Sequence, residues 1–152
     1  MTWERTYPPE ESAATRARSD VRKALPPVGV TDEVRDAVEI VVGELASNAI
    51  RHAATEFAVC VEVEPGHVRV AVYDADTRPP ALLAAGPDAT SGRGLQIVAA
   101  LASVWGWESA ERQGISGKAV WAEVALPREG RGMTEERGGN DGPDGEARVG
   151  GD

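Results

Sequence analysis

The sequence is poor in the residues that build covalent or metal-based scaffolds. Its 152 residues include one cysteine, Cys60, and two histidines. An internal disulfide and a structural zinc site made only of cysteine and histidine are therefore excluded. Aromatic residues make up only 5% of the chain, which leaves aliphatic residues to form the core. A chain of this length predicts one domain, because most domains contain about 100–200 residues.

Positive charge and long apolar runs are also scarce. Lysine and arginine number 16 against 25 aspartate and glutamate residues, and the net charge is −9. Surfaces that bind nucleic-acid phosphates are normally basic, so we do not expect direct binding of DNA or RNA. No run approaches the roughly 18 apolar residues of a membrane span, and the N-terminal segment lacks the apolar region of a signal peptide. The sequence therefore predicts a soluble cytoplasmic protein without membrane contact.

The composition changes at residue 128. Residues 128–152 contain 8 of the 17 glycines and only three apolar side chains, Met133, Ala147 and Val149. These are too few to offset the entropy of ordering the segment. We therefore expect a folded domain over residues 1–127, followed by a disordered, acidic, glycine-rich tail over residues 128–152.

Apolar residues recur every three or four positions in three segments, which is typical of amphipathic helices. The predicted helices cover residues 10–25, 31–54 and 95–103. Thr31 is a suitable N-cap for the second of them.

Alternating apolar residues predict four strands. They cover residues 57–64, 67–73, 104–108 and 119–126. The first two are joined by a turn at Pro65-Gly66, and residues 74–91 form an unusually long loop. This order of elements predicts an α+β fold, a two-layer sandwich in which helices cover one face of a mostly antiparallel sheet.

Three polar residues interrupt the second helix on its apolar side. Asn48 and His52 fall within the apolar stripe, and Glu44 lies on its edge. Buried polar groups without partners are unfavourable, so either this end of the helix projects into water or the three residues line a pocket. In a pocket, Asn48 would offer a carbonyl oxygen to a hard cation and Glu44 would act as a base.

A second candidate site is the glycine-containing segment at residues 91–95, S-G-R-G-L. Free N–H groups at a helix start and a nearby arginine favour phosphate binding, although a simple glycine turn has the same pattern. The dinucleotide-binding fingerprint fails because its third glycine would fall at Ile97. A P-loop at Gly117-Lys118 fails because Ala119 follows the lysine.

A third candidate is Asp74, where the second strand ends and the long loop begins. Its carboxylate could accept a hydrogen bond from an exocyclic amine such as that of adenine, or it could simply form a turn. We interpret Cys60 and the tryptophans of the strands as ordinary sheet residues. No Ser-His-Asp set or metal-ligand cluster stands out.

Taken in order, these segments resemble the GHKL ATPase superfamily, which has the Bergerat fold. More narrowly, residues 7–127 resemble the stand-alone bacterial anti-sigma-factor serine/threonine kinases. The resemblance rests on E-L-A-S-N-A-I-R-H at 44–52, V-Y-D at 72–74, S-G-R-G-L at 91–95 and G-K-A-V-W at 117–121.

The resemblance implies roles for particular residues. Glu44 would be the base that activates the acceptor hydroxyl, Asn48 would hold Mg²⁺, and Asp74 would receive the adenine amine. The loop after Asp74 would be the ATP lid. The nucleotide-binding residues implied in this way are Asn48, His52, Asp74, Gly92, Arg93, Gly94, Leu95 and Lys118.

Two positions depart from the family pattern. Many relatives have D-x-G-x-G where residues 74–78 read D-A-D-T-R, so a glycine near the base is missing and Asp76 adds negative charge near the phosphates. Ala119 stands where relatives often have a threonine near the adenine. One lost hydrogen bond is worth about 0.5–1.5 kcal/mol, so we expect weaker nucleotide binding rather than none.

The function implied by the resemblance is that of an ATP- and Mg²⁺-dependent protein serine/threonine kinase. Such a protein sequesters a sigma factor and phosphorylates an antagonist, the anti-anti-sigma protein, and relatives commonly form homodimers. An alternative is a nucleotide-sensing regulatory module in which ATP orders the lid without physiologically relevant kinase activity. A third reading is a degenerate member that binds no nucleotide.

Overall fold

The computed structural model describes residues 1–80 and 91–127, the side chains of residues 91–93 excepted. The predicted tail (128–152) and the middle of the predicted lid (81–90) lie outside the described residues. The strands are β1 (Thr2–Tyr7), β2 (Phe57–Glu64), β3 (His67–Asp74), β4 (Val104–Arg112) and β5 (Ile115–Ala125). The helices are α1 (Glu11–Ala24), α2 (Asp32–Asn48) and α3 (Ser91–Leu101), with a π-helical turn, η1 (Ala49–Ala53), after α2.

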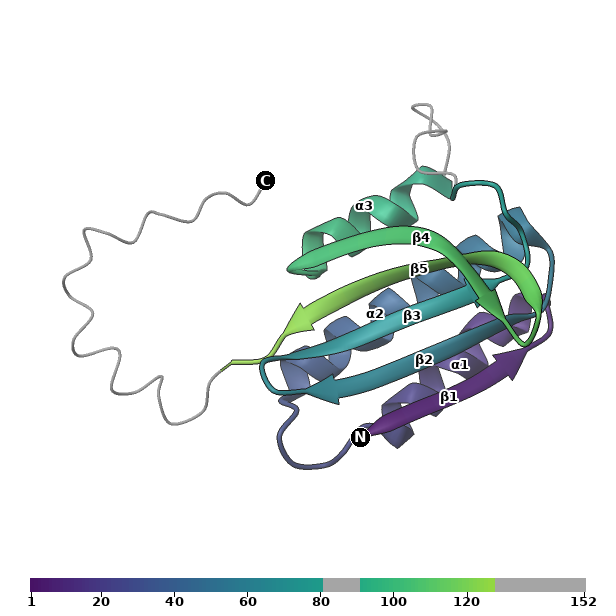
Figure 1. The fold of residues 1–152 in the computed structure, drawn as a ribbon. Coiled ribbons are helices and arrows are strands. Elements are labelled where there is room, and N and C mark those ends of the chain that lie inside the picture. Colours follow the sequence, from purple (N-terminus) through teal and green to yellow (C-terminus); the bar gives the residue numbers. More distant parts are fainter. Residues whose placement is uncertain (81–90, 128–152) are drawn as a thin grey trace, which may run out of the picture.

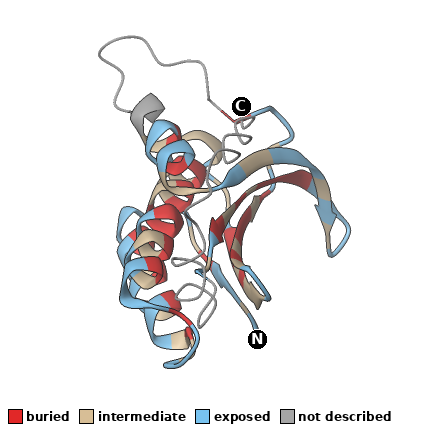
Figure 2. Cartoon of the chain, turned by 90° about the vertical axis from the view of Figure 1, so that its left-hand side faces the viewer, coloured by how far each residue is buried: buried red, intermediate tan, exposed pale blue. Residues whose placement is uncertain are grey.

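The five strands form one antiparallel sheet in the order β1-β2-β3-β5-β4 (Figure 1). The helices cover one face of this sheet, and the buried residues lie between the two layers (Figure 2). The predicted α+β sandwich with helices on one face is confirmed. Within residues 1–80 and 91–127, no helix is both long and apolar enough to cross a membrane.

Helix α2 forms as the sequence predicts. The Thr31 hydroxyl caps its first turn by accepting a hydrogen bond from the Val34 N–H at 3.2 Å. The predicted apolar stripe is buried, and Val38, Val41 and Leu45 are at most 1% exposed. Burial of each such side chain stabilises the fold by about 1.5–3 kcal/mol, so α2 is anchored firmly against the sheet.

The end of this helix differs from the prediction of α-helix as far as Ala54. After Asn48 the backbone widens into the π-helical turn η1, in which the Ala54 N–H donates to the Ala49 carbonyl at 3.0 Å. Ala54 then adopts a left-handed conformation, with φ of 56°, and ends the helical run. Because a π turn contains more residues than an α turn, His52 is rotated relative to Asn48 compared with a continuous α-helix.

Strand β1 is not predicted by the sequence pattern. It pairs with β2, 50–60 residues further along the chain, and it contains Glu4 and Arg5, which obscure its apolar alternation. The buried side chain of Tyr7, 3% exposed, ties its end to the core.

Strand β4 and helix α3 are longer than predicted. Strand β4 continues to Arg112 and turns through Gln113 and Gly114, both with positive φ (52° and 81°), as a two-residue hairpin turn requires. Helix α3 begins at Ser91 rather than at Leu95. The segment Gly92-Arg93-Gly94 therefore lies in the first turn of α3 and not in a loop ahead of it.

Candidate functional site

The buried polar residues of the described chain form a short set. They are Asn48, Asp74 and Lys118, and all three are residues that the sequence predicts for the site. Asn48 is the last residue of α2 and is 6% exposed, so this end of the helix does not project into water. Glu44, one turn earlier, is half-buried.

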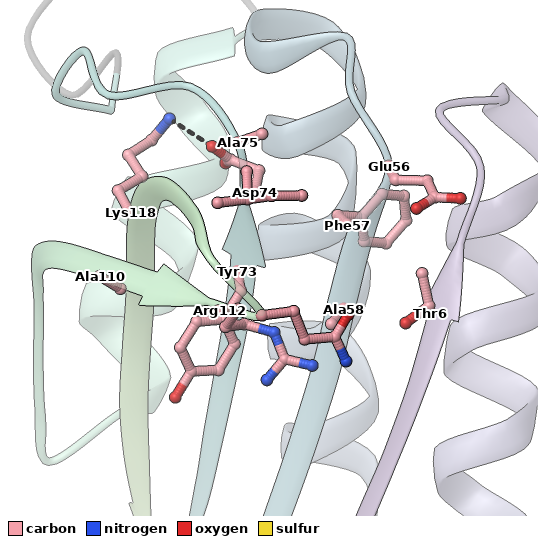
Figure 3. Close-up of a pocket in the computed structure, with 12 residues that line it drawn as sticks. Thr6, Glu56, Phe57, Ala58, Tyr73, Asp74, Ala75, Ala110, Arg112 and Lys118 are labelled. Atoms are coloured by element: carbon pink, nitrogen blue, oxygen red, sulfur yellow. Dashed lines mark hydrogen bonds and ion pairs between the residues drawn. The ribbon is translucent and has the colours of Figure 1, made fainter.

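Asp74 and Lys118 form a buried ion pair at the ends of two neighbouring strands. Lys118 faces Asp74 across the β3–β5 register, and its Nζ lies 3.0 Å from Asp74 Oδ1 (Figure 3). The two side chains are 3% and 2% exposed. Asp74 Oδ1 also accepts from the Asp76 N–H at 2.9 Å, and Lys118 Nζ also donates to the Asp76 carbonyl at 3.3 Å. These extra hydrogen bonds are what a buried pair needs to offset loss of hydration.

The structure corrects the position assigned to Ala119. Ala119 pairs with Tyr73, whereas Lys118 pairs with Asp74. Side chains alternate between the two faces of a sheet, so the Ala119 side chain lies on the face opposite to that of Asp74. The residue beside Asp74 is Lys118, and an ammonium donor stands there rather than no donor at all.

A cavity of about 150 Å³ adjoins this ion pair. It lies between the end of η1 and the segment that follows β3, and its walls are His52, Asp76, Arg78, Pro79 and Lys118. Pockets for nucleotide-sized ligands typically measure about 300–1,000 Å³. The cavity therefore has room for a few polar groups in the conformation observed.

His52 presents an unsatisfied atom at this cavity. Its Nε2 is buried and has no hydrogen-bond partner among the described residues. Burial, followed by the charges of Arg51, Lys118 and Arg78, lowers the pKa of His52 below its ordinary value. The lowered pKa favours the neutral imidazole, and its Nε2 lacks a hydrogen-bond partner among the described residues.

Arg78, which the sequence analysis does not predict as a site residue, neutralises the charge of Asp76. Arg78 holds the Asp76 carboxylate with two nitrogens, Nε at 3.0 Å from Oδ1 and Nη2 at 2.6 Å from Oδ2. The backbone N–H of Arg78 adds a bond to Oδ1 at 2.9 Å. The side chain and the backbone N–H of Arg78 hold the pKa of Asp76 well below its usual range. The opposite charges two positions apart were the available sequence signal.

Two of the predicted motifs meet where α2 passes α3. A Cβ atom placed on Gly94 would lie 2.8 Å from Glu44 Oε1, so the Glu44 carboxylate rests against the first turn of α3. Leu95 is 4% exposed and belongs to the hydrophobic core, so its side chain packs the fold. The side chains of residues 91–93 are outside the described part, and the predicted roles of Gly92 and Arg93 stay predictions.

Glu44 also borders a groove between α1 and α2. The groove is lined by Arg18, Asp36, Glu39, Ile40 and Glu44. The Arg18 side chain lies across Gly43, where an added Cβ would be only 2.7 Å from Arg18 Cδ. The candidate base is therefore reachable from the outer side of the helix layer.

A second cavity lies mainly on the face of the sheet that the helices do not cover. Its lining includes Thr6, Tyr73, Asp74, Arg112 and Lys118 (Figure 3). The Arg112 guanidinium lies 4.7 Å from the centre of the Tyr73 ring and pairs with Glu4. Glu44, Asn48 and His52 do not line this cavity, but Asp74 and Lys118 do, so it reaches the buried ion pair of the candidate site from the other side.

The interpretation of Cys60 as a sheet residue is confirmed. It lies in β2 and is half-buried. Burial, together with nearby Glu4, raises the pKa of its thiol to about 12. At neutral pH the group is a thiol and not a nucleophilic thiolate.

Comparison with known proteins places this geometry in a family. No curated protein matches the chain. A solved structure containing the RsbU and RsbW domains of Rv1364c from Mycobacterium tuberculosis has the same fold, with 19% sequence identity and a TM-score of 0.61. The likeness covers 84% of this chain but 33% of that one, so this chain spans about a third of its length. Residues 7–123 match the histidine kinase-like ATPase domain, and the chain therefore belongs to the histidine kinase-like ATPase domain family.

Proposed function

We propose that this protein binds ATP with Mg²⁺ between the ends of α2 and β3 and acts as an anti-sigma serine/threonine kinase. The observation that carries the proposal is the burial of Asn48, Asp74 and Lys118. Buried polar groups reduce stability unless they are paired or serve a ligand. In an ATPase-domain fold, the position of these residues at one end of the sheet favours the explanation that Asn48 serves a ligand.

The residues present fit ATP and a divalent cation. The Asn48 carboxamide oxygen is a suitable ligand for Mg²⁺, which when bound would neutralise phosphate charge. The orphaned His52 Nε2 would meet a polar group of the nucleotide. Asp74 Oδ2, the oxygen not bonded by Lys118, would accept the adenine amine. Because the cavity is small, we expect the segment 75–80 to move outward when ATP binds.

Phosphoryl transfer would use Glu44 as the general base. The acceptor is a serine or threonine hydroxyl of an antagonist protein that reaches Glu44 through the α1–α2 groove. The hydroxyl oxygen forms a bond to the γ-phosphorus, the bond to the ADP oxygen breaks, and Glu44 takes the hydroxyl proton. The sigma factor and the antagonist are expected to present basic patches, since this chain carries a net charge of −9.

A transfer assay with γ-labelled ATP and candidate antagonists tests this role. Removal of a general base slows a reaction by about 10²–10⁴-fold, so Glu44→Gln should slow transfer by at least about 100-fold. ATP affinity should stay within about threefold. Glu39→Gln is the matched control, because Glu39 lines the same groove but has no proposed role in transfer.

Two other outcomes would overturn the kinase assignment. Transfer by Glu44→Gln at the wild-type rate would remove Glu44 from the chemistry. ATP-dependent partner binding without transfer by the wild type would instead support the nucleotide-sensing regulatory module.

A further inference from the structure

Asp76 and Arg78 lie in the segment that follows β3, and they bind each other. The contact is a fork in which Nε and Nη2 of Arg78 hold both carboxylate oxygens of Asp76. Arginine and carboxylate are well matched in this geometry. The Asp76 side chain is 12% exposed and that of Arg78 is 75% exposed, so the acid lies inward and the base covers it from the solvent.

The pair forms part of the wall of the candidate nucleotide cavity. Both residues line this cavity together with His52 and Lys118. Arg78 Nη2 also donates to the His52 carbonyl at 3.3 Å, which links the segment after β3 to the end of η1. Of the two carboxylates at or just after the end of β3, Asp74 is held by buried Lys118 and Asp76 by exposed Arg78.

The charges of these groups bear on which ligands the cavity accepts. An uncompensated Asp76 carboxylate would repel the phosphates of a nucleotide, and the repulsion grows with the charge of the ligand. Arg78 removes this obstacle by cancelling the Asp76 charge. Because Arg78 is exposed and contributes little to the core, its replacement is expected to leave the fold intact.

We propose that Asp76 and Arg78 act as one neutral unit, and that Arg78 is a specificity-determining residue which lets phosphorylated nucleotides enter the cavity. This inference rests on the proposed binding of ATP. It differs from direct phosphate binding by Arg78, because removal of Asp76 should offset the loss of ATP affinity that removal of Arg78 causes.

The test is a double-variant cycle read by calorimetric titration of ATP with Mg²⁺, ADP with Mg²⁺, and adenosine into the full chain. Arg78→Ala should weaken ATP binding about tenfold, ADP binding less, and adenosine binding less than about twofold. Asp76→Ala should tighten ATP binding a few-fold. The double variant Asp76→Ala/Arg78→Ala should bind ATP within about twofold of the wild type, and Arg78→Lys should recover most of the loss.

The matched control is Arg22→Ala, which removes an exposed arginine that pairs with Asp36 and Glu39 on the helix layer. It changes the net charge equally and should leave all three affinities unchanged. Equal losses of ATP affinity in Arg78→Ala and the double variant would overturn the inference, and so would wild-type affinity in Arg78→Ala. Absence of ATP binding by the wild type would instead overturn the proposed function, and the inference with it.

Discussion

Lys118 is the buried cation of the candidate site. Its ammonium group binds one carboxylate oxygen of Asp74 and the backbone carbonyl of Asp76, so a single side chain contacts both acidic residues, one at the end of β3 and one just after it. Both members of the ion pair are almost completely buried. Each therefore depends on the other, because removal of one leaves an uncompensated charge in the interior.

Lys118→Met should accordingly lower the free energy of unfolding by about 3–5 kcal/mol, the usual effect of breaking a buried pair. The double variant Lys118→Met/Asp74→Leu should recover most of this loss, because no charge is then buried. Urea denaturation followed by circular dichroism measures both. A single variant that loses less than about 1 kcal/mol, or a double variant as unstable as the single one, would contradict this account.

At this scale, part of the site can be predicted from sequence. Asn48 and Asp74 are found because a polar residue on an apolar helix face and an acid at a strand end are local signals. The partnership of Asp74 with Lys118 depends on the register between β3 and β5, which no local pattern sets. In the sequence analysis, the position near the adenine is assigned to Ala119 instead of Lys118 for the same reason. An error of one residue in the register moves a side chain to the other face of the sheet.

Among the elements, the ends of β3 and β5 approach each other most closely at Gly117. A Cβ atom added there would lie 1.8 Å from the Asp74 carbonyl oxygen and 2.8 Å from Ala75 Cα. These neighbours are backbone atoms and cannot rotate away. Only glycine fits at this position, and the close approach keeps Asp74 within reach of Lys118.

Gly117→Ala should therefore push the end of β3 away from β5. We expect a loss of at least about 2 kcal/mol in the free energy of unfolding, as in other overpacked sites, together with weaker ATP binding. Gly66→Ala is the matched control at the other end of β3. Gly66 has a φ of 95° and open space around its Cβ position, so the variant should lose stability through backbone strain and keep its ATP affinity once folded. Full stability and affinity in Gly117→Ala would refute the role of this contact.

Elements with strong periodicity are predicted well and those set by distant pairing are not. Helices α1 and α2 and the β2–β3 hairpin have local signals in their apolar spacing, caps and turns. Strand β1 is an edge strand whose partner residues in β2 lie 50–60 positions further along the chain. The π-helical turn η1 has no sequence signal of its own, and it is this turn that sets the orientation of His52 relative to Asn48.

At the scale of the whole molecule, the two faces of the sheet differ in what covers them. Helices cover one side of the sheet, and the candidate site lies in that layer, where α2, α3 and the strand ends meet (Figures 1 and 2). The order and character of the layers follow from composition and pattern alone, because amphipathic helices and alternating strands have few ways to bury their apolar faces. The position of the site follows from where buried polar residues gather, and this the sequence predicts only in part.

The central claim is that the end of α2 holds the cation of a bound ATP. Calorimetric titration of ATP with Mg²⁺ into the full chain and into Asn48→Ala tests it most directly, with Asn48→Asp as the control that keeps an oxygen ligand. We predict saturable binding by the wild type, a loss of at least about tenfold in Asn48→Ala, and partial recovery in Asn48→Asp. The absence of saturable binding by the wild type, or equal affinity in Asn48→Ala, would contradict the account.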